Sequence, residues 1–332
     1  LMHDQSTYLF GDFDDNEWES DLAGFGNTFP HPYGSTDGKY YTTLLTVSPA
    51  GDELTLNFAK ALVEAENIGQ DDVTDYLSIS FSSNDYVCHL FGPSSLEAED
   101  QLLHLDKILA ELFAFIDEKV GLKNTLIVFS ADHGTPEAPG YNKHFGLNSA
   151  YVNPQSWDRD PAINTLKAKF GIGSELIEVY NHPYLNLNKK VIQQAGLDPI
   201  KVEQEVAKIL LTFPGVAAAV PSSSLLDASL PDTAINRAIL KNYHPKRSGD
   251  IYLVFEPRHF INDFDGLVVA STHGMPYNYD SYVPVIFAGM DLDPQIIHRR
   301  IYTIDIAPTL AAITETNLPS GTEGEMLKEV TD

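Results

Sequence analysis

The sequence is poor in positive charge and in cysteine. Only 21 Lys and Arg residues stand against 47 Asp and Glu residues, which gives a formal net charge of −26. A charge of that sign and size opposes binding to nucleic acid or to an anionic membrane. The single cysteine, Cys88, excludes any disulfide within the chain, so cysteine pairing says nothing about the cellular compartment.

Long apolar runs are also missing. No run of about 18 apolar residues is present that could span a membrane. The first residues, LMHDQSTYLFGDFDD, lack the basic and then apolar pattern of a signal peptide. Because this opening contains no first strand or helix cap, we expect that an upstream segment of the natural protein is absent from the chain.

The apolar content that is present suffices for a large core, since 43% of the 332 residues are hydrophobic. Residues 1–50 are rich in Gly, Asp, Asn and Pro, and they are expected to form extended loops. A helix is predicted over residues 54–68, where apolar residues recur at helical spacing. The chain should therefore be globular, with a loop-rich beginning.

A predicted strand then leads to the first chemically interesting residues. The stretch DYLSISFSS, residues 75–83, alternates apolar and polar side chains, as a strand does, and we expect it to deliver Asp85 from its carboxyl end. His89 follows four residues later. After Pro93, Ser94 and Glu97 form a capping box, which predicts a long helix that ends near residue 121.

A second strand is predicted where TLIVF, residues 125–129, runs unbroken by charge. Such a run is typical of a strand buried on both faces of a parallel sheet. Asp132 and His133 follow this strand, and His273 follows a third predicted strand in GLVVASTHG, residues 266–274. Ligands of doubly wound α/β folds bind at this carboxyl edge of the sheet.

The predicted fold class is α/β, with a mostly parallel sheet sandwiched by helices. YVPVIFAG, residues 282–289, supplies a further strand, and residues of about 150–250 resemble a small inserted α/β subdomain. We therefore expect a main domain that begins with residues 1–150, an insertion over residues 151–255, and a return to the main domain over residues 256–332.

Five potential metal ligands now gather at predicted strand ends: Asp85, His89, Asp132, His133 and His273. Carboxylate and neutral imidazole are the ligand types of catalytic zinc sites. Any one of these histidines taken alone is more often an ordinary loop or core residue. Five groups at one edge exceed the needs of a single catalytic zinc, so two metals are the more natural reading.

Several longer stretches resemble one known family. SFSSNDYVCHLFGP, VFSADHG, STHGMPYNYDSYVPVIFAG, YTIDIAPTLAAI and LPSGTEGEML are similar to the metal-binding half of the alkaline phosphatase superfamily. The resemblance is to monomeric bacterial zinc alkaline phosphatases, and it runs over nearly the whole chain. It implies an alkaline phosphatase-like fold and two zinc ions, the first held by Asp85, His89 and His273, the second by Asp132 and His133.

The resemblance also implies an activity, namely hydrolysis of phosphate monoesters through a covalent phosphoenzyme. In the family the nucleophile is a Thr or Ser on an early strand, and no matching residue is found here, so we expect it on the upstream segment. Thr272 and Ser130 are hydroxyls beside ligands, but strand-end hydroxyls usually bond to the backbone. The catalytic residue is therefore unknown from this chain.

Two alternatives stay open. The first is a phosphodiesterase or nucleotide pyrophosphatase of the same superfamily, which shares the ligands. The second is a catalytically inactive zinc-binding module. The resemblance further implies small-molecule phosphate ester substrates, a periplasmic or secreted location and a monomer, while no nucleic-acid partner and no membrane span are expected.

The remaining histidines and the cysteine are not expected to bind metal. Cys88 lies between two ligands but is interpreted as a small packed residue, and His144 as a loop residue near the cleft. The other histidines match no ligand motif and are expected at the surface or in structural roles: His3, His31, His104, His182, His244, His259 and His298.

Overall fold

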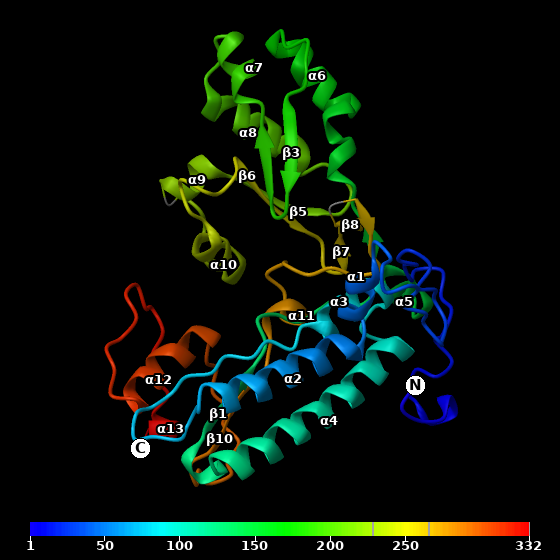
Figure 1. Ribbon diagram of the computed structural model, residues 1–332. Coiled ribbons are helices and arrows are strands. Elements are labelled where there is room, and N and C mark those ends of the chain that lie inside the picture. Colours follow the sequence, from blue (N-terminus) through cyan, green and yellow to red (C-terminus); the bar gives the residue numbers. More distant parts are fainter. Residues whose placement is uncertain (228, 265, 332) are drawn as a thin grey trace.

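The computed structural model describes residues 1–227, 229–264 and 266–331. Its elements form a lower body around the long helices and an upper body around the largest sheet (Figure 1). Residues 1–40 are irregular apart from a 3₁₀ turn at Gln5–Thr7, which confirms the predicted loops, while α1 (Tyr41–Thr46) adds a helix that was not predicted. No described helix is long and apolar enough to cross a membrane.

Two long helices shape the lower body. Helix α2 (Pro49–Ala65) confirms the predicted helix with an earlier start, and Pro49 occupies its first turn, where its missing N–H costs nothing. Helix α4 (Leu96–Lys119) packs beside it through Leu56, Ile108 and Leu112. The apolar stripe of each helix is thus buried against the other.

The cap of α4 differs from the predicted one. Ser95, not Ser94, is the N-cap, and its hydroxyl accepts a hydrogen bond from Ala98 N at 3.1 Å. Ser94 instead donates to the Glu137 carboxylate at 2.8 Å. Both serines precede the helix in sequence, so only the backbone geometry decides which of them caps it.

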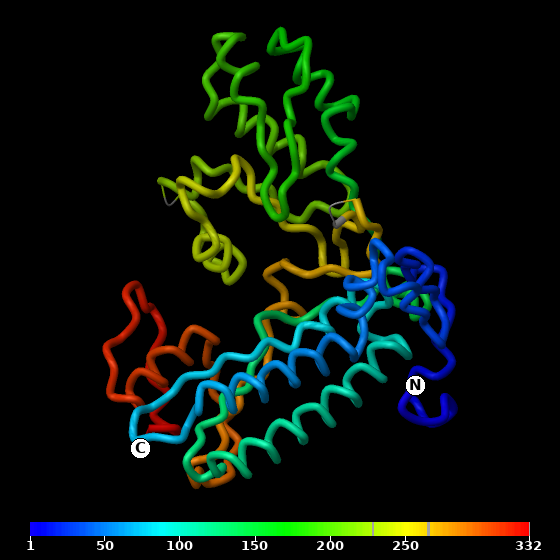
Figure 2. The backbone as a smooth tube through the Cα atoms, in the orientation of Figure 1, coloured from blue at the N-terminus to red at the C-terminus, as the bar shows by residue number. Residues whose placement is uncertain are grey.

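The prediction of a strand over residues 75–83 is wrong. Residues 74–82 belong to no strand, and helix α3 (Ser83–Phe91) begins directly after them, so Asp85 and His89 lie on a helix. The stretch still packs Ile79 and Phe81 against the core between α2 and α4, and Figure 2 shows it running beside α2. Alternating apolar residues thus specified an extended backbone, but a strand also needs a hydrogen-bonding partner.

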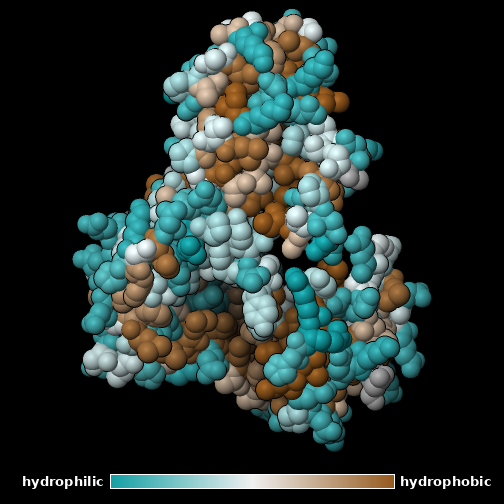
Figure 3. All heavy atoms as spheres, turned by 180° about the vertical axis from the view of Figure 1, so that it is seen from behind, coloured by the Kyte–Doolittle hydropathy of each residue, from teal (hydrophilic) through white to brown (hydrophobic). Residues whose placement is uncertain are grey.

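The expected mostly parallel sheet is also not found among the described residues, where parallel pairing is limited to the two-residue strands β2 (Ala150–Tyr151) and β7 (His259–Phe260). Strand β1 (Leu126–Ser130) confirms the second predicted strand, but it pairs only with β10 (Val285–Gly289), and the pairing is antiparallel. Both strands are half-buried or exposed rather than fully buried. From behind, apolar side chains show widely on the surface of the lower body (Figure 3).

The upper body contains a four-stranded antiparallel sheet in the order β3-β4-β6-β5. Helices α6, α7 and α8 share a hydrophobic core with this sheet. Ile163, Leu185 and Val206 are among the residues of that core. The bounds are α6 (Pro161–Phe170), β3 (Ile177–Asn181), β4 (Tyr184–Leu187), α7 (Lys189–Gln194), α8 (Pro199–Leu210), β5 (Val216–Pro221) and β6 (Ile251–Phe255). The tight β3–β4 hairpin places His182 at its tip, pointing back toward the lower body.

The remaining elements are short. The third predicted strand is reduced to β9 (Leu267–Val268), which pairs with β8 (Asp263–Phe264), so His273 lies in a loop beyond it. The others are α5 (Pro139–His144), β2 (Ala150–Tyr151), α9 (Ser222–Leu226), α10 (Ala234–Asn242), β7 (His259–Phe260), α11 (Asn278–Ser281), α12 (Ile306–Ile313), α13 (Lys328–Thr331), and 3₁₀ turns at Leu122–Asn124, Pro154–Arg159 and Thr303–Asp305.

The cap of α4 gives a direct test of this geometry. Replacing Ser95 by Ala removes the acceptor for Ala98 N at a fully buried position and should lower the free energy of unfolding by about 1–2 kcal/mol. Ser94→Ala is the matched control and should cost less, because it leaves that cap intact. Urea denaturation measures both, and an equal or larger loss for Ser94→Ala would contradict the assignment.

Candidate functional site

Helix α3 carries the first two candidate ligands on one face. Asp85 and His89 are four residues apart, which brings their side chains together one turn apart. The start of α3 is fixed by Asp52 of α2, whose buried carboxylate accepts hydrogen bonds from Ser83 N at 3.2 Å and from Gln101 Nε2 at 2.8 Å. Three helices are thus joined at the end of α3 that presents Asp85.

The other end of this ligand pair is joined to the loop before His273. The carbonyl of His89 accepts hydrogen bonds from Ala270 N at 2.8 Å and Ser271 N at 3.3 Å. In return, His89 Nδ1 lies 2.7 Å from the carbonyl of Ser271. A carbonyl only accepts, so Nδ1 donates a proton to Ser271, and Nε2 is the ring nitrogen that faces Asp85.

The loop then places His273 beside Asp85. Asp85 Oδ1 lies 3.5 Å from His273 Nε2, and Asp85 Oδ2 lies 3.4 Å from His89 Nε2. Donor atoms of Asp85, His89 and His273 all lie within 4.8 Å of one another. One carboxylate and two imidazoles therefore converge from a helix and a loop that are far apart in sequence.

His133 and Asp132 adjoin this group. The rings of His133 and His273 stack with centroids 3.5 Å apart at an angle of 17°, and His133 Nε2 lies 3.5 Å from Asp132 Oδ2. His133 Nδ1 lies 3.1 Å from the Gly134 carbonyl, which leaves Nε2 as the available lone pair. Of the five predicted ligands, the structure thus brings Asp85, His89 and His273 together and stacks His133 on His273. Asp132 lies beside His133 with 88% of its side chain exposed.

Electrostatic coupling sets the charges of this group. Burial alone would raise the pKa of Asp85, but the hydrogen bond and charge of His89, with His273 and His133, bring it below the usual value. Burial would lower the pKa of His89, but Asp85 and the Ser271 carbonyl raise it. Asp85 is therefore an anion held between imidazoles.

His273 behaves differently. Burial, followed by the neighbouring charge of His133, lowers the pKa of His273 to about 4. Its imidazole is therefore neutral near pH 7, which is the form that binds metals.

The donor set fits a zinc ion. Asp85 Oδ1 is a buried oxygen that receives no hydrogen bond from the described residues, and buried carboxylate oxygens normally have a partner. One carboxylate and two imidazoles are ligand types of catalytic zinc. The unsatisfied oxygen, with the Nε2 atoms of His89 and His273 both facing Asp85, indicates a cation as the missing partner.

Sequence reasoning missed three residues that support this group. Asp52 holds the start of α3, as described above. His182 at the hairpin tip packs against the backbone of His273 and Gly274, and Tyr180 OH lies 2.7 Å from its Nδ1. Asp280 accepts hydrogen bonds from Gly274 N and Met275 N. Only one signal pointed to such support, namely that both His133 and His273 are followed by glycine, which marks close backbone contact.

Cys88 and His144 lie outside the group of ligands, as expected. Cys88 is buried among Val87, Leu90 and Phe91, and burial raises the pKa of its thiol to about 12, so the thiolate that would bind a metal is disfavoured. His144 is exposed and lies near the rings of Phe13 and Phe145.

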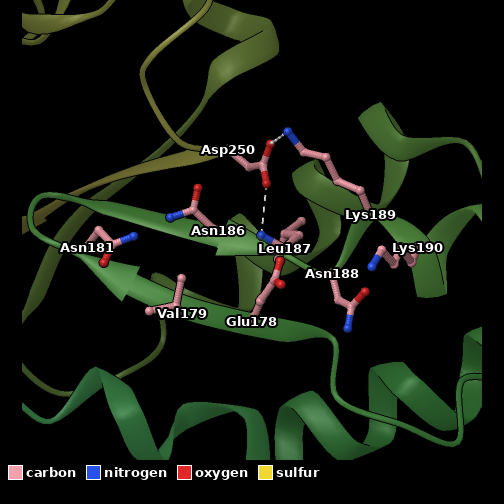
Figure 4. Close-up of a pocket in the computed structure, with 9 residues that line it drawn as sticks. All are labelled: Glu178, Val179, Asn181, Asn186, Leu187, Asn188, Lys189, Lys190 and Asp250. Atoms are coloured by element: carbon pink, nitrogen blue, oxygen red, sulfur yellow. Dashed lines mark hydrogen bonds and ion pairs between the residues drawn. The ribbon is translucent and has the colours of Figure 1, made fainter.

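A polar cavity of about 400 Å³ on the upper body contains none of the five ligands (Figure 4). Asp250 occupies its wall, pairs with Lys189 Nζ at 3.1 Å and accepts a hydrogen bond from Leu187 N at 2.8 Å. Asp250 and Lys189 thus already have partners. The chemistry of the molecule therefore concentrates at the histidine group and not in this cavity.

Comparison with known proteins identifies the family of the chain. Residues 12–276 match the family described as type I phosphodiesterase / nucleotide pyrophosphatase. The chain belongs to this family. The predicted membership of the alkaline phosphatase superfamily is thereby confirmed.

Individual relatives give the same picture. The chain is 33% identical to a "Calcium-transporting ATPase" of Myroides odoratus, over 97% of this chain and 59% of the relative, and 31% identical to alkaline phosphatase PhoV of Synechococcus elongatus, over 98% and 57%. The crystal structure of wild-type alkaline phosphatase PafA superposes with a TM-score of 0.89 at 29% identity and covers 100% of this chain and 62% of that one. The chain therefore has an alkaline phosphatase-like α/β fold and spans about 60% of the length of these relatives.

The half-buried His182 makes a testable contribution to acid sensitivity. Burial lowers the pKa of His182 to about 4, so between that pH and the ordinary histidine pKa only the unfolded chain takes up the proton. The free energy that neutral His182 contributes to folding is fully present above the pKa of histidine in the unfolded chain, and it is lost as the pH falls below that value. In the metal-free protein, His182 should lower the free energy of unfolding by at most about 2 kcal/mol between pH 7 and pH 5.

Replacing His182 by Gln should remove this loss, so the variant should lose less stability than the wild type between the two pH values. Urea denaturation at pH 7 and pH 5 measures the difference. His298→Gln, at an exposed histidine, is the control and should behave as the wild type does. Equal acid losses in wild type and His182→Gln would contradict a half-buried, neutral His182.

Proposed function

We propose that the protein is a zinc-dependent hydrolase of phosphate monoesters. The observation that carries the proposal is the convergence of Asp85, His89 and His273, with donor atoms within 4.8 Å, beside the stacked ring of His133. Family membership and the likeness to alkaline phosphatase PafA support the same reaction class.

Each ligand has a separate part in this proposal. Asp85, His89 and His273 hold the first zinc, and Asp132 and His133 contribute to the second. When bound, zinc ions neutralise the charge of the phosphoryl oxygens and stabilise the attacking and leaving oxygens. The Nδ1 donations of His89 and His133 fix the ring tautomers that such binding requires.

Local positive charge is what the rest of the chain lacks. With a formal charge of −26, the protein repels an anionic phosphate ester unless cations gather at the site. The five ligands present two carboxylates and three imidazoles, and two divalent ions would reverse the sign of the charge there.

The nucleophile is not evident among the described residues. Thr272 is buried, and Ser130 Oγ donates to the Pro284 carbonyl at 2.9 Å, so neither hydroxyl is free beside Asp132 and His133. We therefore place the Thr or Ser that forms the phosphoenzyme outside these 332 residues. This placement accords with the fraction of its relatives' length that the chain spans.

A second candidate function is hydrolysis of phosphate diesters or nucleotide pyrophosphates. It is favoured by the description of the matched family, which names those activities. The two candidates share the metal ligands and differ in the residues that hold the second ester group.

The metal assignment predicts the zinc content of variants. The full-length protein should bind about two zinc ions per chain. Asp85→Ala and His273→Ala should each lose the zinc of the first position, because each removes one of its three donors. Metal analysis after dialysis measures the content.

His144→Ala is the matched control, because His144 is an exposed histidine outside the ligand group, and it should keep the wild-type zinc content. Unchanged zinc in both Asp85→Ala and His273→Ala would refute the assignment.

The substrate class is tested separately. Since metal ions stabilise the leaving oxygen without a titrating general acid, hydrolysis of an aryl phosphate monoester should exceed that of the matched diester and persist at alkaline pH. The ratio of kcat/KM for the two substrates at pH 7 and pH 9 measures this preference. A higher kcat/KM for the diester would favour the second candidate.

A further inference from the structure

Asp280 lies between the two loops that carry His133 and His273. Its side chain is 95% buried, since only 5% of the residue is exposed. Asp280 Oδ2 accepts hydrogen bonds from Gly274 N at 2.9 Å and from Met275 N at 2.7 Å, and its backbone carbonyl accepts one from Gly134 N at 2.7 Å. One residue thus binds the backbone directly after each of two candidate ligands.

The glycines after both histidines explain why this contact can be so close. A Cβ on Gly134 would lie 2.1 Å from the carbonyl oxygen of Tyr279, and a Cβ on Gly274 would lie 2.3 Å from His182 Nε2. Gly274 also has φ +108°, a backbone conformation that L side chains rarely adopt. Gly134 is therefore required by the contact with Tyr279, whereas Gly274 is required by its own backbone conformation and by the packing of His182.

No regular secondary structure holds these ligand loops. Residues 131–138 and 269–277 belong to no described helix or strand, so no ladder of hydrogen bonds fixes the backbone beside His133 and His273. The loop of His273 is held before the histidine by the bonds of Ala270 N and Ser271 N to the His89 carbonyl and of Ser271 Oγ to the Pro136 carbonyl. Asp280 adds restraint directly after the histidine, at Gly274 and Met275.

We propose that Asp280 is a positioning residue whose side chain holds the loop of His273 for metal binding at the first zinc position, while its backbone carbonyl ties the residue after His133 to the same turn. The proposal rests on the proposed zinc-dependent function. Asp280 contacts neither a ligand atom nor substrate, and it acts through the backbone of the residues that follow the two histidines.

The rival explanation is a purely structural carboxylate that only stabilises the turn at residues 274–280. That role would change the free energy of unfolding but would leave the metal affinity of the folded protein unchanged. Metal affinity and metal geometry therefore separate the two roles.

The experiment compares Asp280→Ala with Asp280→Asn in the full-length protein. Ala removes both acceptors of the side chain, whereas Asn keeps one oxygen that can accept from Gly274 N and Met275 N. We expect Asp280→Ala to weaken zinc binding at the first position, which His273 serves, by about 10- to 100-fold, and Asp280→Asn to weaken it less. The second position should change less, because the backbone carbonyl that binds Gly134 N remains in both variants. Competition with a zinc chelator measures the affinities, and visible absorption of the cobalt-substituted protein reports the coordination geometry.

Asp293→Ala, at an exposed aspartate, is the control and should leave both affinities unchanged. Wild-type affinity at both positions in a folded Asp280→Ala variant would overturn the proposal. So would a loss confined to the second position, because the side chain that the substitution removes bonds to the loop of His273.

Amide hydrogen exchange of the metal-free wild type covers the case in which Asp280→Ala does not fold. The amides of Gly134, Gly274 and Met275 should exchange slowly, as hydrogen-bonded amides do. Exchange as fast as in the exposed loops would overturn the proposal without any variant. Because this readout needs no zinc, slow exchange in a protein that binds no zinc would refute the proposed function and leave the backbone contacts of Asp280 in place.

Discussion

The junction between His89 and the segment 270–271 is the constraint on which the candidate site depends. Three hydrogen bonds join residues 89 and 270–271, two to the His89 carbonyl and one from its ring. They fix the ring tautomer of His89 and, through the same loop, the place of His273. Without this junction Asp85 and His89 would remain a helix-surface pair with no third donor.

The charge of the molecule gives this geometry its chemical meaning. An acidic chain that concentrates imidazoles around one buried carboxylate creates a place for cations that the remaining surface cannot offer to an anionic substrate. Asp85 is held as an anion against the effect of burial, while burial keeps His273 neutral. Both forms are those that ligate a metal.

Sequence motifs located the site better than they located its supporting structure. The segments around Asp85, Asp132 and His273 were recognised because carboxylates and histidines follow apolar runs at short distance. The elements that carry them were predicted less well, since Asp85 lies on α3 and His273 in a loop. Side-chain periodicity specifies which face of a segment is apolar, but the pairing partner of a strand is a long-range property.

The sequence by itself determined the helices α2 and α4, the five donor residues and the family, because helical spacing and ligand type are local properties that a linear pattern records. Only the tertiary structure decided that Ser95 caps α4, that β1 pairs antiparallel with β10, and that Asp52, His182 and Asp280 surround the ligands. These contacts join segments far apart in the chain through single hydrogen bonds to the backbone. Such bonds leave no periodic trace in the sequence, so their partners become known only when the chain has folded.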